Sequence, residues 1–227
     1  MKDKPTVWAI IPAKGVSTRI PGKNLKDLCG KPMLAYILET AKAARGIDRV
    51  IVTTDSEDVR KVALQYGAEV PFIRPAALSE DHVTTREVLA HALSWFKENE
   101  GVLPEYTLLL YPTSPLLKKE RIEEAIALAH ERGSDSVISG SLDKGHYWIE
   151  VEGGWVRFYP QKQVNSQYQT PLFVENGAIY LTKSEIMRRQ YVADKADVVL
   201  MDADENIDVD YPEDFKRVED ILKGKGA

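Results

Sequence analysis

Hydrophobic residues in this chain follow two alternating patterns. Short, nearly continuous apolar runs, typical of buried strands, are separated by segments in which apolar residues recur every three or four positions, typical of amphipathic helices. Strands are predicted over residues 7–11, 49–53, 69–72, 106–111, 136–139 and 178–181. Helices are predicted over residues 33–44, 57–66, 85–98, 120–131 and 212–222.

Glycines follow the helical segments. Gly46, Gly67, Gly101 and Gly133 each come just after one of them, where glycine commonly ends a helix. The alternation of strands and helices predicts an α/β fold, a Rossmann-like, mainly parallel sheet with helices on both faces. Ligands of such sheets bind beyond the carboxyl ends of the strands.

Residues 141–172 depart from this alternation. Here a Gly153-Gly154 pair lies between two runs in which apolar and polar residues apparently alternate, which predicts a β-hairpin. The segment is rich in aromatic and histidine side chains: His146, Tyr147, Trp148, Trp155, Phe158, Tyr159 and Tyr168. A hairpin that covers the sheet edge would explain it, but aromatic enrichment favours a dimer interface. We therefore expect a single domain over residues 1–227 with an inserted dimerisation arm over 141–172.

The loop after the first strand combines glycines with cations. Gly15 and Gly22 are interleaved with Lys14, Arg19 and Lys23. Glycines let the backbone approach an anion and cations neutralise a polyphosphate, so the loop has the composition of a phosphate cradle. It is not a P-loop, because an asparagine follows the Gly-Lys pair where a magnesium-binding Ser or Thr is required. A solvated turn with solubilising lysines would have the same composition.

Two acidic pairs occur near the C-terminus. If residues 207–210 are extended, Asp208 and Asp210 share one face while Ile207 and Val209 point into the core. Two carboxylates on one face can hold Mg²⁺ together with phosphate oxygens. Asp202 and Asp204 have the same spacing, and the pattern alone does not decide between the pairs.

Composition limits the possible functions. The 227 residues are 44% hydrophobic, enough to bury a substantial core. The net charge of -5 argues against general nucleic-acid binding. The chain has one cysteine and shows neither an apolar signal segment nor a run long enough to span a membrane, so we expect a cytoplasmic protein without membrane or nucleic-acid partners.

Several segments together resemble one enzyme family. They are, in chain order, IPAKGVSTRIPGKNLKDLCGKPML, RVIVTTDSEDV, FIRPAALSED, LLYPTSPL, ENGAIY and NIDVD. Their collinear order over nearly the whole chain resembles the acylneuraminate cytidylyltransferase (CMP-sialic acid synthetase) family. The resemblance implies a homodimeric enzyme that uses CTP and Mg²⁺. It would join CMP to the anomeric hydroxyl of a nonulosonic, sialic-acid-like 2-keto-3-deoxy sugar acid and release pyrophosphate.

The resemblance also implies roles for individual residues. Those with catalytic roles are Lys14, Arg19, Lys23, Asp208 and Asp210, of which Asp208 and Asp210 would hold the metal. Those that would bind the nucleotide are Ala13, Lys14, Gly15, Lys23, Asn24, Arg74 and Thr85. Those that would bind the sugar are Tyr111, Asn176, Gly177 and Tyr180.

Some of these residues have simpler explanations. Arg74 would also fit a salt bridge with Glu80 or Asp81, and Thr84 and Thr85 would both fit helix capping. The Asn-Gly dipeptide at 176–177 is typical of a tight turn. Asp55 could contact a metal or the ribose, but we expect it to cap the helix that begins near residue 57.

The chain also departs from the family pattern. Tyr111 stands where the family commonly has glutamine, and Glu175 stands where many sialic acid enzymes have a basic residue. A sugar carboxylate would then need another cation, such as Lys144 or Arg157 on the arm. A nucleotidyltransferase for another keto sugar acid, such as an octulosonate, remains an alternative. So does a non-catalytic nucleotide-binding protein of the same fold.

Overall fold

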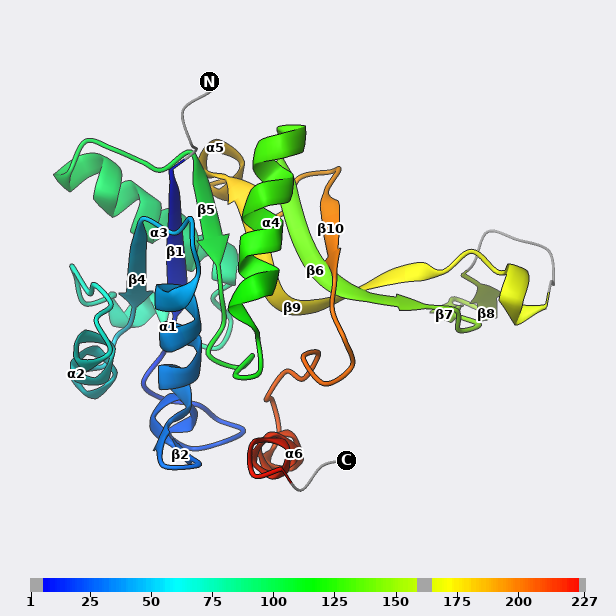
Figure 1. The fold of residues 1–227 in the computed structure, drawn as a ribbon, viewed down its shortest axis with the longest axis horizontal. Helices are drawn as coiled ribbons and strands as arrows, with labels where there is room; N and C mark the ends of the chain where they lie inside the picture. The colour runs from blue at the N-terminus through cyan, green and yellow to red at the C-terminus, as the bar shows by residue number, and fades with distance from the viewer. Residues whose placement is uncertain (1–5, 159–164, 225–227) are drawn as a thin grey trace.

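A six-stranded sheet forms the centre of the molecule (Figure 1). The computed structural model describes residues 6–158 and 165–224. The strand order is β10-β6-β9-β5-β1-β4, and every strand except β9 runs in the same direction. The strands are β1 (Val7–Pro12), β4 (Arg49–Thr53), β5 (Tyr106–Leu109), β6 (Ser136–Asp143), β9 (Leu172–Lys183) and β10 (Asp197–Leu200). The predicted mainly parallel sheet is confirmed.

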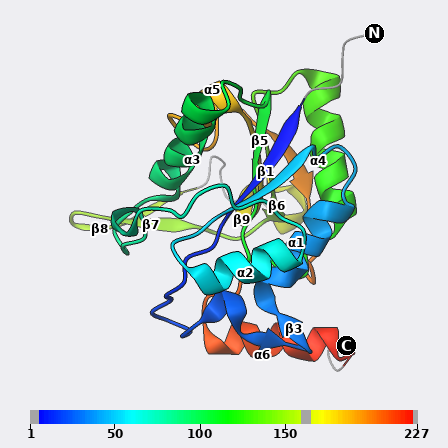
Figure 2. The ribbon, with the colours of Figure 1, turned by 90° about the vertical axis from the view of Figure 1, so that its left-hand side faces the viewer.

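Helices cover both faces of the sheet, as predicted (Figure 2). One face carries α1 (Met33–Ala43), α2 (Glu57–Gln65) and α4 (Lys119–Arg132), and the other carries α3 (Thr85–Asn99) and α5 (Ser184–Met187). Alternation along β1 explains both layers, because Ala9 and Ile11 pack in the α1 layer while Ile10 packs in the α3 layer. No helix among the described residues is both long and apolar enough to cross a membrane.

The structure corrects one strand prediction and contains one edge strand that was not predicted. Residues 69–72 form only isolated bridges, at Glu69 and Ile73, because Pro71 has no N–H to continue a ladder. The unpredicted strand β10 lies at the sheet edge, where Val199 is buried but Val198 and Leu200 are partly exposed. Its apolar run is too short to be distinguished from a loop in the sequence.

The chain after β1 lies at the point where the sheet changes its winding direction. β4 pairs with one side of β1 and β5 with the other. The loop then continues into η1 (Lys23–Leu25), β2 (Asp27–Leu28) and β3 (Lys31–Pro32) before α1 begins. Crevices at such switch points are the usual ligand sites of open α/β sheets.

The loop after β1 and the C-terminal segment meet in a separate apolar cluster. Ile20 and Leu28 from the first loop pack with Ile207 and Val209 and with Phe215 of α6 (Pro212–Leu222). Figure 2 shows α6 beside β3, below the helices α1 and α2. This contact fixes the C-terminal acidic segment against the first loop.

The described part of the segment 141–172, residues 141–158 and 165–172, forms an arm that projects from the body (Figure 1). Its β7 (Trp148–Val151) and β8 (Gly154–Arg157) pair as the predicted antiparallel hairpin and form a sheet of their own. The hairpin therefore does not extend the edge of the main sheet. Between the arm and the body lie the long strands β6 and β9, and η3 (Ser166–Tyr168) follows the hairpin, whereas Tyr159 lies outside the described residues.

The pairing of β6 with β9 contains an irregularity. The register shifts between Ile138 and Gly140, and the Asn-Gly dipeptide of β9 lies within the extra residues. Asn176 and Gly177 therefore form a bulge inside a strand, and the tight turn suggested by their sequence is wrong. A Cβ added to Gly140 would lie 2.2 Å from the Val174 carbonyl oxygen, so only glycine allows this approach.

We predict that Gly140→Ala lowers the free energy of unfolding by at least about 1–3 kcal/mol, because a strand must move to admit the methyl group. Gly133→Ala is the control, because a Cβ there meets no atom within 4 Å and only the positive φ of 67° is strained. Its loss is expected to be about 1 kcal/mol. Denaturant unfolding measures both, and equal losses would contradict the close-approach explanation.

Candidate active site

A cavity of about 330 Å³ lies at the carboxyl ends of the central strands. Five of the residues singled out in the sequence line it: Lys14, Arg19, Arg74, Thr85 and Tyr111. They come from the loop after β1, the segment after β4, the start of α3 and the end of β5. The fold thus gathers three of the seven predicted nucleotide-binding residues (Lys14, Arg74 and Thr85), the predicted catalytic Arg19 and the predicted sugar residue Tyr111 around one crevice.

The peptide group between Lys14 and Gly15 is held on both sides. The Asn24 side-chain amide donates to the Lys14 carbonyl oxygen at 2.8 Å, and the Gly15 N–H donates to Asp55 Oδ1 at 2.9 Å. Gly15 also packs so closely on Ser56 that an added Cβ would lie 2.6 Å from the Ser56 Cβ. The close packing on Ser56 therefore requires glycine at position 15, in addition to any role of this residue in letting the backbone approach an anion.

Asp55 does not cap α2, contrary to the sequence prediction. Ser56 is the N-cap, and its side chain accepts a hydrogen bond from the Val59 N–H. Asp55 turns toward the first loop instead, because the strand β4 ends at Thr53 and so places Asp55 at the switch point of the sheet. Sequence spacing did not distinguish these neighbouring polar residues.

All three predicted phosphate-binding cations have acidic partners. Lys14 Nζ lies 2.5 Å from Asp81, a residue that the sequence analysis considered only as a partner for Arg74. Arg19 Nη1 lies 2.6 Å from Asp210 Oδ2. Lys23 Nζ lies 3.3 Å from Asp210 Oδ1 and donates to the Val209 carbonyl oxygen at 2.8 Å. Residues nearly the whole chain apart thus meet in one cluster. Ala13 is buried beneath the loop and donates its N–H to the Thr53 carbonyl oxygen at 3.0 Å.

The acidic segment has the predicted alternation, although no strand forms there. Ile207 and Val209 are buried, and the Val209 N–H donates to the Thr113 carbonyl oxygen at 2.8 Å. Asp208 and Asp210 lie on the other face. The alternative pair is excluded from the cluster, because Asp202 is bound by Arg121 at 3.0 Å at the surface of α4.

The two carboxylates differ in their electrostatic surroundings. Desolvation and the nearby Asp210 charge raise the pKa of Asp208, although Asp208 keeps accessible surface, and a hydrogen bond from Thr113 opposes the shift. Partial burial also pushes the pKa of Asp210 upward, but the hydrogen bond from Arg19 and the charge of Lys23 outweigh it. The net pKa shift of Asp210 is downward, so it is the firmly ionised member of the pair.

Arg74 is a buried cation in the wall of the cavity. Its residue is 3% exposed, and its guanidinium donates to Ser79 Oγ at 3.0 Å and to the Thr53 carbonyl oxygen at 3.4 Å. Burial lowers the pKa of Arg74, and the Asp55 carboxylate 3.7 Å away counteracts that shift. The predicted alternative partners are not used: Asp81 binds Lys14, and Glu80 contacts His82.

At the start of α3, two neighbouring threonines that the sequence could not distinguish have different roles. Thr84 is the N-cap and forms a capping box with Glu87. Thr85 lies inside the helix, and its hydroxyl accepts a hydrogen bond from the Tyr111 hydroxyl at 3.0 Å. Capping therefore explains Thr84 alone, and Thr85 is free to serve the cavity that it lines.

Of the predicted sugar residues, Tyr111 lines this cavity. Tyr180 meets Tyr111 edge to face at 6.5 Å and donates its hydroxyl to Glu175 at 3.1 Å. Asn176 Oδ1 accepts from Ser139 Oγ at 2.6 Å and from the Ala178 N–H at 3.1 Å, which secures the bulge. Gly177 has a positive φ of 75° in that bulge. The contact of Glu175 with Tyr180 was missed because it joins residues on a strand whose irregular register the sequence does not reveal.

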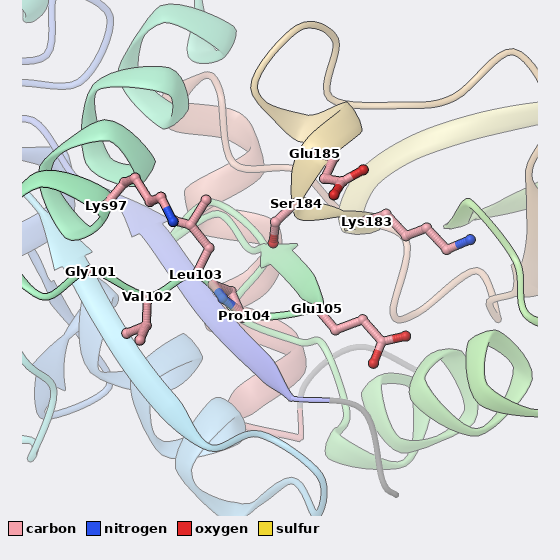
Figure 3. A pocket seen from close by; sticks show the side chains of 9 residues that line it. All are labelled: Lys97, Gly101, Val102, Leu103, Pro104, Glu105, Lys183, Ser184 and Glu185. Carbon is pink, nitrogen blue, oxygen red and sulfur yellow. The ribbon is translucent and has the colours of Figure 1, made fainter. Parts of the chain in front are cut away.

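A larger cavity, of about 510 Å³, lies at the opposite edge of the sheet (Figure 3). Two of its polar side chains are already engaged, since Lys183 pairs with Asp135 at 2.7 Å and the Ser184 and Thr107 hydroxyls are 2.7 Å apart. The labelled acidic side chains Glu105 and Glu185 point outward. It therefore lacks the convergent polar groups of a binding site.

A divalent metal would find only two carboxylates here. Within residues 6–158 and 165–224, no group of three or more His, Cys, Asp or Glu side chains is placed to hold a metal. Asp208 and Asp210 nevertheless fit Mg²⁺, which commonly takes one or two carboxylates and completes its shell with phosphate oxygens and water. Their hard oxygen atoms and their position beside the phosphate-binding cations match that chemistry.

Comparison with known proteins agrees with this geometry. The family model described as cytidylyltransferase matches residues 8–223. CMP-N,N'-diacetyllegionaminic acid synthase of Legionella pneumophila is 29% identical over 225 residues, which cover 96% of each chain. Pseudaminic acid cytidylyltransferase of Campylobacter jejuni is 31% identical over 183 residues, which cover 78% of each chain.

Solved structures show the same fold. A CMP:2-keto-3-deoxy-manno-octonic acid synthetase complexed with CTP superposes with a TM-score of 0.71 at 17% identity, covering 97% of this chain and 99% of that chain. A 4-diphosphocytidyl-2C-methyl-D-erythritol synthase from Anaerococcus prevotii gives a TM-score of 0.70, also at 17% identity. Because the family model covers nearly the whole sequence, the chain belongs to the cytidylyltransferase family.

Proposed function

We propose that this protein transfers CMP from CTP to the anomeric hydroxyl of a nonulosonic, sialic-acid-like 2-keto-3-deoxy sugar acid and releases pyrophosphate. One observation carries the proposal: Arg19 and Lys23 pair with Asp210, the neighbour of Asp208, and Arg19 also lines the cavity at the switch point together with Lys14. Cations that receive a triphosphate and carboxylates that receive a metal are the parts that nucleotidyl transfer requires.

The sugar-acid class rests on the relatives. The legionaminic and pseudaminic acid enzymes named above, at 29% and 31% identity, both act on nonulosonic acids. This chain differs from the sialic acid pattern at Tyr111 and Glu175, which adjoin the proposed sugar side of the cavity. We therefore place its substrate among the nonulosonic acids and leave the choice of acid to the substrate panel below.

The chain's own residues supply binding and charge neutralisation. The sugar hydroxyl loses its proton to water and attacks the α-phosphorus of CTP. A new oxygen–phosphorus bond forms, the bond from the α-phosphorus to the oxygen that bridges it to the β-phosphorus breaks, and pyrophosphate leaves with that oxygen. Lys14, Arg19 and Lys23 neutralise the triphosphate as charge moves onto the departing pyrophosphate. Arg74 and Thr85 line the nucleotide side of the crevice, and Tyr111 and Tyr180 orient the sugar. A magnesium ion on Asp208 and Asp210 would supply further positive charge to the triphosphate oxygens.

Incoming substrate would exchange one set of ion pairs for another. In the free protein Lys14 is paired with Asp81, and Arg19 and Lys23 are paired with Asp210. A triphosphate offers these cations stronger anionic partners, and a metal offers Asp210 a divalent one. The site is thus electrostatically balanced before binding as well as after it.

We further propose that the arm joins two copies of the chain. Trp148, Trp155 and Phe158 are 50%, 62% and 56% exposed, a concentration of aromatic surface that a monomer rarely leaves in water. The enzyme would work in the cytoplasm, where its substrate CTP is made.

We predict magnesium-dependent release of pyrophosphate from CTP with at least one member of a panel of legionaminic, pseudaminic, sialic and octulosonic acids. Asp210→Ala is expected to lower the rate at least about a hundredfold, because it removes a carboxylate proposed to hold the magnesium ion, whose charge would stabilise the transition state. Asp202→Ala, at the same spacing but bound to Arg121 at the surface, is the matched control and should keep the rate within about twofold. Equal losses in both variants would refute the assignment of the acidic pair. CTP binding without turnover of any sugar would favour a non-catalytic nucleotide-binding protein.

We predict opposite stability effects for the two carboxylates. The raised pKa of Asp208 means that the folded state disfavours its ionised form, so Asp208→Asn should raise Tm at pH 7. The lowered pKa of Asp210 means that its charge stabilises the fold, so Asp210→Asn should lower Tm. Both differences should shrink as the pH falls toward and below about 4, the ordinary pKa of an unfolded aspartate. Thermal unfolding without nucleotide measures both, and shifts of the same sign at pH 7 would contradict the electrostatic account.

We predict that Trp155→Glu converts a dimer into a monomer, because a buried charge would replace aromatic surface at the interface. Light scattering after size-exclusion chromatography measures the mass. Val102→Glu, a substitution of a 51% exposed apolar residue on the body, is the control and should leave the mass unchanged. A monomeric wild-type protein would rule out the proposed assembly.

A further inference from the structure

Asp55 lies between two parts of the nucleotide site without lining the cavity itself. Its Oδ1 accepts the Gly15 N–H at 2.9 Å and lies 3.7 Å from Arg74 Nη2. Gly15 belongs to the phosphate loop and Arg74 to the cavity wall. A single carboxylate oxygen thus connects two segments that approach the nucleotide from different strands.

The link to the loop acts on a defined peptide group. The carbonyl of the Lys14–Gly15 peptide is held by Asn24, and the N–H of the same peptide is held by Asp55. With both ends of the group bound, the peptide plane cannot rotate without breaking a hydrogen bond. Because Lys14 is the residue on the carbonyl side of this peptide, its side chain leaves the backbone in a fixed direction, into the cavity that it lines.

The link to Arg74 acts through charge. Arg74 is 3% exposed, and its other partners, Ser79 Oγ and the Thr53 carbonyl oxygen, are neutral. Asp55 is the carboxylate that lies within ion-pair distance of this guanidinium among the described residues. A buried guanidinium that loses its only counter-charge is expected to shift toward water, away from the position it has in the wall.

We propose that Asp55 is a positioning residue for the nucleotide, which holds the Lys14–Gly15 peptide by a hydrogen bond and Arg74 by charge. This rests on the proposed CTP-binding function. Asp55 differs from its neighbours Ser56 and Asp58, whose polar groups serve the helix α2: the Ser56 hydroxyl caps it, and Asp58 forms an exposed ion pair with Lys61 at 3.2 Å. The role explains why an aspartate at this helix start does not cap the helix.

The test is CTP binding by isothermal titration calorimetry in the presence of Mg²⁺, which needs no knowledge of the sugar. Asp55→Ala removes both links and should weaken CTP binding roughly tenfold to a hundredfold. Asp55→Asn keeps an oxygen acceptor for the Gly15 N–H but loses the charge, and should weaken binding by roughly threefold, between wild type and Asp55→Ala. In turnover, the KM for CTP should rise while the KM for the sugar acid stays within about twofold.

Ser56→Ala is the matched control, since it removes the helix cap but keeps the Cβ that packs against Gly15. It should lower Tm and leave CTP affinity within about twofold of wild type. Asp58→Ala should change neither. These controls separate loss of helix stability from loss of nucleotide positioning.

Asp55→Ala with wild-type affinity for CTP would overturn the inference, even if its Tm fell. If Asp55→Asn binds CTP no more tightly than Asp55→Ala, the loop link is overturned. If Asp55→Asn binds CTP as tightly as wild type, the charge link is overturned. If Asp55→Ala fails to fold, Asp55→Asn alone still tests the charge link. A wild-type protein that does not bind CTP would overturn the proposed function as well, and this would be seen before any variant is compared.

Discussion

The site depends on one hydrophobic contact between the loop after β1 and the C-terminal segment. Ile20 and Leu28 in the first loop pack against Ile207 and Val209, and this packing presses the acidic face of the C-terminal segment onto the cations of the loop. Polar attraction alone would be a weak way to bring such distant residues together, because exposed ion pairs contribute little to stability. Burial of the alternating aliphatic side chains supplies the free energy, and the charged groups on the opposite face are carried into position.

The resulting electrostatic balance is asymmetric. Asp210 is shared by Arg19 and Lys23, whereas Asp208 receives one hydrogen bond from Thr113 and faces its acidic neighbour. Asp208, whose surroundings disfavour its charge, is well placed to bind an incoming cation. Arg19 and Lys23 share a single carboxylate and are well placed to bind an incoming anion. Such an arrangement is common at functional sites, where side chains are placed for function and the free energy of unfolding is lower than it would be if they were placed for stability alone.

The reversed strand β9 shapes the other half of the molecule. Its bulge at Asn176 and Gly177 is secured by Ser139 and closed against Gly140, where no side chain larger than hydrogen fits. Beyond the bulge, β6 and β9 continue out of the body and become the base of the arm. The same two strands therefore place Tyr180 and Glu175 beside the cavity and carry the aromatic hairpin away from it.

Much of this was determined by the sequence alone. Short-range periodicity predicted the layers, since buried strands and amphipathic helices impose their own spacing, and the alternation of Ile207 to Asp210 predicted the outward carboxylates. The tertiary structure decided which of several similar polar residues does what. Asp208 and Asp210, rather than Asp202 and Asp204, meet the phosphate loop, and Ser56, rather than Asp55, caps the helix. The reason is physical: periodicity reports which face of an element is buried, but the partners of a polar group depend on strand order, register and packing between segments distant in the chain.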